Sequence, residues 1–173
     1  MMEALARALA RRRVTLGFVF AIAVLYLASP SRGSLIAGAA IGAVGEAIRI
    51  WAAGHLEKSR EVTTSGPYRF TRHPLYLGSS IMALGIAVGC RSILVAGLVF
   101  LYMASTIGAA IRTEEAFLRA RFGDAYDAYA EARAPRVRRR FSFERAWRNK
   151  EYRALIGLFV ALLLLVFRAW LAR

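Results

Sequence analysis

Long apolar runs alternate with short arginine-rich segments along the whole chain. A helix needs about 20 residues to cross the hydrocarbon core of a bilayer. Five runs approach that length, and where a run is short its flanking arginines can snorkel to the headgroups. The pattern therefore predicts five transmembrane helices, over residues 14–29, 33–54, 74–90, 92–111 and 154–171.

The composition agrees with a single membrane domain. The chain has 173 residues, 58% of them hydrophobic, and a mean hydropathy of +0.44, whereas soluble domains are about 45–50% apolar. We expect one all-α, polytopic membrane helical bundle over residues 1–173. The first run also has features of a signal peptide, but Pro30 stands where cleavage would occur and more spans follow, which favours an uncleaved anchor.

The basic residues predict an orientation. The formal net charge is +14, but the arginines flank apolar runs, which favours contact with anionic headgroups over nucleic acid. With the N-terminus in the cytosol, the inner segments hold 20 Lys and Arg residues and the outer segments hold four. The positive-inside rule therefore predicts a cytosolic N-terminus and an outer C-terminus. The long connections 55–73 and 112–153 are then cytosolic, and we expect the active site there.

Local spacing predicts further features. Gly38-x-x-x-Gly42 and Gly85-x-x-x-Gly89 each place two glycines on one helix face, which predicts close helix packing. One amphipathic helix along the membrane surface, weakened by Gly123, is predicted by the spacing of Leu118, Phe122, Tyr126 and Tyr129. Residues 136–153 alternate arginines with aromatic residues. They either draw a lipid headgroup toward the site or form a solvated belt before the last span.

The connection before the third run carries the first candidate site. Gly66-Pro67 predicts a turn, and Pro74 suits the first turn of a helix, where its missing N–H costs nothing. The positive end of that helix then lies beside Arg72 and His73, an arrangement that holds an anionic group such as a carboxylate. The alternative is that these side chains anchor the chain at the headgroup level.

Two adjacent carboxylates, Glu114 and Glu115, follow the fourth run. The negative end of a helix does not favour them, so they require partners such as ribose hydroxyls, an amino group or Arg112. Alternatively, they belong to a solvated helix that continues out of the membrane. Within the second run, Glu46 and Arg49 either serve function, as intramembrane charges often do, or neutralise each other at i,i+3.

Several other chemistries find no support in the sequence. His55 and His73 lack a cysteine or carboxylate cluster with metal-ligand spacing. The single cysteine, Cys90, excludes an intrachain disulfide. The G-x-G-x-x-G turn of dinucleotide-binding sheets is absent.

Taken together, the two polar segments resemble the isoprenylcysteine carboxyl methyltransferase and phospholipid methyltransferase superfamily of integral membrane enzymes. Residues 72–78 match its Arg-His-Pro-x-Tyr-x-Gly motif, and residues 114–118 match its Glu-Glu-x-x-Leu motif. Residues 122–129 resemble the pattern that usually follows. The resemblance covers a core of about residues 46–135, whereas the basic connector and last span, residues 136–173, carry none of it.

The resemblance implies methyl transfer from S-adenosyl-L-methionine, bound at the cytosolic side between the third and fourth spans. The cofactor-binding residues that it implies are His73, Pro74, Leu75, Tyr76, Gly78, Glu114 and Glu115. A carboxylate acceptor needs only a cation to orient it, whereas an amine must first lose a proton. The candidate catalytic cations are Arg49, Arg72 and Arg112.

The sequence leaves more than one hypothesis open for the substrate and for the reaction class. We expect a lipid or a prenylated small molecule in a bacterial inner membrane, with the acceptor atom and the oligomeric state left open. NADPH-dependent membrane reductases of the sterol reductase type resemble the same region, but Leu75 stands where they often carry asparagine, which favours methyl transfer. A non-catalytic membrane scaffold is the third hypothesis.

Overall fold

The computed structural model describes residues 20–135 and 137–172. Its elements are α2 (Arg32–Ala53), the short 3-10 helix η1 (Gly66–Arg69), α3 (Pro74–Cys90), α4 (Ile93–Phe122), α5 (Asp124–Ala130), α6 (Phe143–Arg148) and α7 (Tyr152–Leu171). Residues 20–27 are also helical. The described residues contain no strand, so the predicted all-α class is confirmed for them.

Three of these helices, α2, α4 and α7, have the length and apolar composition of membrane spans. The apolar α3 has 17 residues, which is about 26 Å at 1.5 Å per residue. Large apolar side chains are exposed on α4 and α7, among them Phe100 at 71% and Phe159 at 62%. Apolar surface of this extent requires a nonaqueous neighbour, and the chain is a membrane protein.

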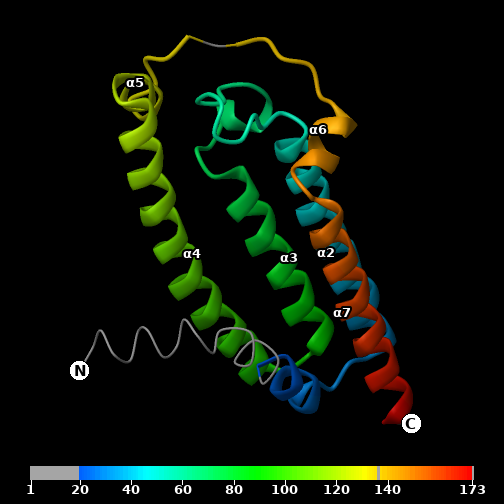
Figure 1. Cartoon of the computed structure of the whole chain (residues 1–173). Coiled ribbons are helices and arrows are strands. Elements are labelled where there is room, and N and C mark those ends of the chain that lie inside the picture. The colour runs from blue at the N-terminus through cyan, green and yellow to red at the C-terminus, as the bar shows by residue number, and fades with distance from the viewer. Residues whose placement is uncertain (1–19, 136, 173) are drawn as a thin grey trace, which may run out of the picture.

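The first predicted span falls only partly within the described residues, because residues 14–19 lie outside them. Residues 20–27 form a helix near the turn between α3 and α4 (Figure 1). Val24 and Ala28 bury themselves there against Cys90, Val95 and Leu165. The number of five spans and the orientation in the membrane stay predictions.

The backbones of α2 and α3 lie in direct contact at glycines. A Cβ added to Gly38 would lie 2.5 Å from the carbonyl oxygen of Gly85, and one added to Gly45 would lie 2.6 Å from that of Gly78. No side chain fits at such distances. These two contact points lie about two helical turns apart on each helix, so the glycines of each helix lie on one face. The predicted close packing through glycines is confirmed.

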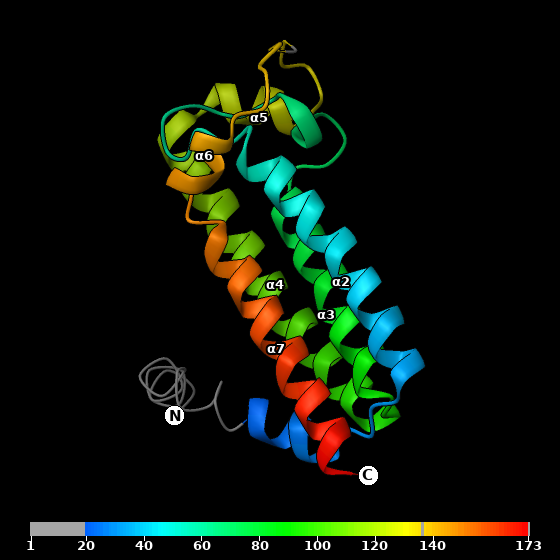
Figure 2. The ribbon, with the colours of Figure 1, turned by 90° about the vertical axis from the view of Figure 1, so that its right-hand side faces the viewer.

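The other two long helices, α7 and α4, differ in how they pack against α2 and α3. α7 packs against both α2 and α3, and Figure 2 shows it running along them. α4 begins beside the end of α3 and leans away from it toward α5 (Figure 1). The separation between α3 and α4 is therefore greatest near the start of α3.

The return segment, residues 137–151, passes back over the end of α2. Asn149 Nδ2 donates to the carbonyl oxygens of Ala53 and Leu56, both at 2.9 Å, and Arg145 Nε donates to that of Gly54 at 2.8 Å. The last carbonyl groups of a helix have no donor within the helix. The return segment supplies those donors, and so fixes the end of α2 and the loop that follows it.

The single amphipathic helix predicted over residues 118–129 is interrupted. α4 ends at Phe122, and α5 begins at Asp124. Between them Gly123 has φ +49°, a conformation that glycine adopts without steric cost. The turn directs Tyr126 inward, where it is 1% exposed. The prediction of a continuous surface helix is wrong because the backbone at Gly123 leaves the helical conformation and separates α4 from α5.

We predict that Gly85→Ala lowers the thermal unfolding midpoint in detergent. The added methyl group would lie 2.6 Å from backbone atoms of Gly38 and Gly42, and overpacking typically costs about 1–3 kcal/mol. Gly97→Ala is the matched control, because a Cβ there meets open space and alanine favours a helix by about 0.5–1 kcal/mol over glycine. Equal midpoints for the wild type and Gly85→Ala would contradict the backbone contact.

Candidate functional site

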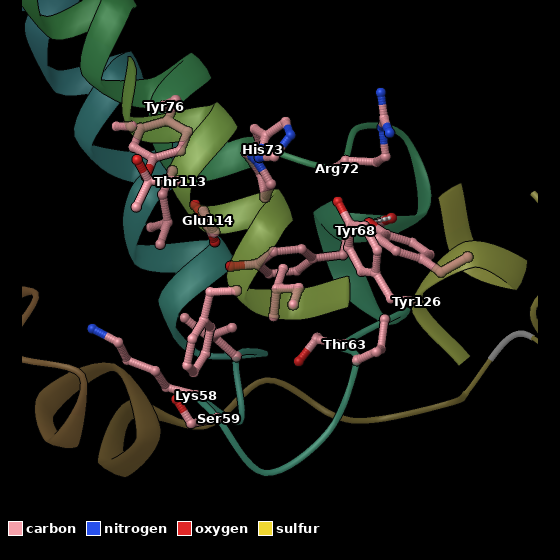
Figure 3. A pocket seen from close by; sticks show the side chains of 18 of the residues that line it. Lys58, Ser59, Thr63, Tyr68, Arg72, His73, Tyr76, Thr113, Glu114 and Tyr126 are labelled. Carbon is pink, nitrogen blue, oxygen red and sulfur yellow. Dashed lines mark hydrogen bonds between the residues drawn. The ribbon is translucent and has the colours of Figure 1, made fainter. Parts of the chain in front are cut away.

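A cavity of about 780 Å³ lies between α3, α4 and the loop that joins α2 to η1 (Figure 3). Its walls come from segments far apart in the sequence: residues 56–63, 72–76, 109–118 and 126–129, with Arg49 from α2 and Tyr68 from η1. It occupies the region where α4 leans away from α3. Both predicted motif segments contribute to its walls.

Glu115 ties α4 to the start of α3. Pro74 begins α3, as predicted, and His73 precedes it as the N-cap. Glu115 Oε1 lies 3.1 Å from His73 Nε2 and 3.2 Å from Arg72 Nη1. The other oxygen, Oε2, lies 3.6 Å from Arg119 Nη1. This carboxylate is therefore occupied by protein partners, whereas His73 Nδ1 is buried without a hydrogen-bond partner among the described residues.

The side chains of Glu114 and Glu115 point in different directions. Successive side chains on a helix diverge by about 100°, so one of two adjacent glutamates can face His73 while the other faces the cavity. Glu114 lines the cavity together with Tyr76 and Thr113 (Figure 3). Glu115 takes part in three salt bridges, whereas Glu114 forms none within the described residues. Its carboxylate lies within reach of the Tyr76 hydroxyl, and its remaining lone pairs can accept hydrogen bonds from a ligand.

Arg49 reaches the cavity wall by crossing the first turns of α3. Its Nε donates to Glu151 Oε1 at 2.6 Å. Its Nη1 donates to the Leu75 carbonyl oxygen at 3.3 Å and to Ser79 Oγ. A Cβ on Gly78 would lie 2.5 Å from Arg49 Cγ. The motif position therefore requires a glycine, because the Arg49 side chain passes directly over it.

Three tyrosines close the cavity from η1 and α5. Burial raises the pKa of Tyr129 to about 12 and also raises the pKa values of Tyr68 and Tyr126. All three therefore keep their phenol protons at neutral pH and can act as donors. Tyr129 donates to the Tyr68 carbonyl oxygen at 2.8 Å. The Tyr126 hydroxyl is buried without a partner in the described residues.

The cavity brings together most of the residues singled out from the sequence. Its lining includes His73, Pro74, Leu75, Tyr76 and Glu114, and the cations Arg49 and Arg72. Three others lie outside the lining. Gly78 packs under Arg49, Glu115 holds His73, and Arg112 is exposed on α4. Their roles in binding or catalysis stay predictions.

Sequence reasoning missed the loop after α2. Lys58, Ser59, Glu61 and Thr63 line the cavity, but no motif marks them. Tyr126 and Tyr129 were assigned to a surface helix, although their place in the trailing pattern of the family was a signal. No cluster of three metal-ligating side chains occurs in the part of the chain that the structure describes.

Comparison with known proteins decides the family. The sequence model of the family described as phospholipid methyltransferase matches residues 22–125, more than half of the chain. The chain belongs to this family. The matched region contains the Arg-His-Pro-x-Tyr-x-Gly and Glu-Glu-x-x-Leu segments, and it ends within α5.

Three curated relatives match about half of this chain. Cobalt-zinc-cadmium resistance protein CzcN of Cupriavidus metallidurans is 36% identical over 87 residues, 49% of this chain and 39% of that protein. Nickel-cobalt-cadmium resistance protein NccN of Alcaligenes xylosoxydans xylosoxydans is 36% identical over 84 residues, 47% and 39% of the two chains. Protein-S-isoprenylcysteine O-methyltransferase of Schizosaccharomyces pombe is 31% identical over 97 residues, 56% and 41%. The chain thus spans about two-fifths of each relative, and no solved structure matches it.

We predict that His55 makes the folded protein less stable in mild acid. Burial lowers its pKa below 6.5, and Arg145 and Arg139 lower it further. The unfolded chain therefore binds a proton that the folded chain does not, so stability falls as the pH drops below about 6.5. Thermal unfolding of His55→Gln over this range should show a shallower pH dependence than the wild type. The same slope in both proteins would contradict a neutral His55.

Proposed function

We propose that this protein transfers a methyl group from S-adenosyl-L-methionine to a membrane-embedded, lipid-like substrate. The observation that carries the proposal is that residues of both family motifs line one cavity, with His73 and Tyr76 from the start of α3 and Glu114 from α4. Membership of the phospholipid methyltransferase family supports the reaction class. The name of the Schizosaccharomyces pombe relative, an isoprenylcysteine O-methyltransferase, supports a lipid-like substrate.

The cavity suits this methyl donor in size and in polar groups. Its volume of about 780 Å³ lies within the ~300–1,000 Å³ of small-molecule sites. His73 Nδ1 and the Tyr126 hydroxyl are buried without partners in the described residues, and such atoms normally find a partner in a ligand or water. Glu114 can accept hydrogen bonds from ribose hydroxyls, and the tyrosine rings offer faces for an adenine base.

The residues have orienting roles in this proposal. The bound cofactor supplies an electrophilic methyl group on a sulfonium. The acceptor atom forms a bond to that carbon as the sulfur–carbon bond breaks, so the reaction depends on alignment and exclusion of water. Arg49 and Arg72 carry the cations at the cavity wall that can orient a carboxylate. An amine acceptor must in addition lose a proton before it attacks.

We further propose that the cavity faces the cytosol of a bacterial cell, in a bundle of five spans. The cavity lies at the end of the bundle that carries the connections 55–73 and 112–153. These connections hold most of the basic residues of the chain. The positive-inside rule assigns such segments to the cytosolic side.

Calorimetric titration of the detergent-purified protein tests the reaction class. We expect saturable binding of S-adenosylhomocysteine and no binding of NADPH, because the cavity is that of a methyl donor in this proposal. Binding of NADPH alone would replace the methyltransferase with the reductase. Binding of neither compound by a folded sample would favour the scaffold.

Two substitutions test the cavity residues. His73→Ala and Glu114→Gln should each weaken binding of S-adenosylhomocysteine by about tenfold or more, because a hydrogen bond to a charged group is worth ~1.5–3 kcal/mol. Glu115→Gln should weaken it less, because the amide keeps an acceptor oxygen for His73 but loses the charge that pairs with Arg72. The matched control is Glu131→Gln, which removes an exposed charge paired with Arg133 outside the cavity. Wild-type affinity in both His73→Ala and Glu114→Gln would overturn the site.

A further inference from the structure

A partly buried ion pair at the cavity joins α2 to the N-terminal end of α7. Arg49 Nε lies 2.6 Å from Glu151 Oε1, and the two side chains are 19% and 7% exposed. Arg49 also belongs to the cavity wall. Glu151 therefore contacts the cavity through Arg49, although it is not part of the lining itself.

Two buried carboxylates flank this one guanidinium, and they differ in how they hold it. Glu46 Oε2 lies 3.9 Å from Arg49 Nε, and neither oxygen of Glu46 has a hydrogen-bond partner among the described residues. Glu151, in contrast, accepts a short hydrogen bond from Nε. A directional bond fixes the plane of a guanidinium, whereas a distant charge does not. Of the two carboxylates, Glu151 sets the orientation of Arg49.

Glu151 itself is held in place by the return segment. Its backbone N–H donates to the Ala146 carbonyl oxygen at 3.1 Å, and its carbonyl oxygen accepts from Ala154 at 2.9 Å. Asn149, two residues earlier, is bonded to the end of α2. Lys150 between them has φ +62°, which turns the chain sharply into α7. The carboxylate is thus presented from a backbone that is fixed on both sides.

The contact comes from outside the region that matches the family. That match ends at residue 125, and the return segment carries no motif of the family. Nevertheless, the carboxylate of Glu151 bonds to a side chain of α2 that crosses the motif glycine Gly78 and donates to the first turn of α3. The C-terminal part of the chain therefore determines how one wall of the cavity is built.

We propose that Glu151 is a positioning residue for methyl transfer, which holds the Arg49 guanidinium at the cavity wall so that it can orient an anionic group of the bound reactants. The inference rests on the proposed function. Without Glu151, the guanidinium keeps only its Nη1 bonds to Leu75 and Ser79, and the nearest remaining carboxylate is Glu46, one turn earlier on its own helix. The cofactor pocket then still forms, but the cation that orients the reacting groups is displaced, and displacement of about 1 Å can cost ~100-fold in rate.

The test compares variants at both carboxylates with the full-length protein in vesicles of phosphatidylethanolamine and phosphatidylglycerol that contain a farnesylated cysteine analogue with a free carboxylate. The initial rate of label transfer from methyl-labelled S-adenosyl-L-methionine to extracted lipid is divided by the number of sites that bind S-adenosylhomocysteine. Glu151→Ala should lower this rate per site by about 100-fold. Glu151→Gln keeps an acceptor oxygen for Arg49 and should lose about tenfold.

Two controls share the chemistry of these changes. Glu46→Gln removes the other carboxylate near Arg49 and should keep the rate per site within about twofold. Glu144 lies in the same return segment, is 88% exposed, and lies 4.0 Å from Arg148. Glu144→Gln should therefore show the same rate per site as the wild type. Should Glu151→Ala fail to fold, Glu151→Gln against Glu46→Gln decides the question.

The outcomes separate this inference from the proposed function. An active wild type with unchanged rates per site in both Glu151 variants would overturn the positioning role, because fewer folded molecules would then explain any loss of total activity. Equal losses in Glu46→Gln and Glu151→Gln would also overturn it, in favour of the total charge of the cluster. A wild type that binds S-adenosylhomocysteine but transfers no label would contradict the proposed function and with it the role of Glu151.

Discussion

The close approach of α2 and α3 sets the geometry on which the site depends. At Gly45 and Gly78 the two backbones leave no room for a Cβ, and contact at this distance fixes the rotation of one helix against the other. One turn after Gly45, Arg49 emerges where α3 carries its motif. The guanidinium can bond to the Leu75 carbonyl oxygen and Ser79 because Gly78 lets its stem pass. The glycines thereby determine where a cation of the cavity wall lies.

The second wall depends on a different kind of contact. α4 leans away from α3 (Figure 1), and near the cavity Glu115 joins the two through His73 and Arg72. An ion pair with hydrogen bonds can bridge helices that do not pack side by side, provided that its remaining polar atoms are satisfied. The separation leaves space for a ligand, and the neighbouring Glu114 faces that space. Of the two adjacent carboxylates, Glu115 thus joins α4 to the start of α3, and Glu114 faces the cavity.

The sequence was sufficient for the helical class, the glycine packing and the motif residues among the cavity lining. These follow from local rules: apolar length, glycine spacing and a motif that starts a helix with Pro74. It was insufficient for the division of labour between Glu114 and Glu115, because their directions depend on the rotation of α4. The contact of Glu151 with Arg49 joins residues 102 positions apart, and no periodic pattern connects such positions. The loop residues of the cavity were missed for the same reason, since their placement depends on the return segment.

Thiol protection would test the location of the cofactor most directly. Cys90, the one cysteine of the sequence, is fully buried, so an introduced cysteine can be labelled selectively by a water-soluble maleimide. The account predicts that saturating S-adenosylhomocysteine slows labelling of Thr113→Cys, in the cavity wall. Labelling of Ala120→Cys, exposed on the same helix outside the cavity, should not change. Equal labelling of Thr113→Cys with and without bound S-adenosylhomocysteine would contradict a cofactor site between α3 and α4.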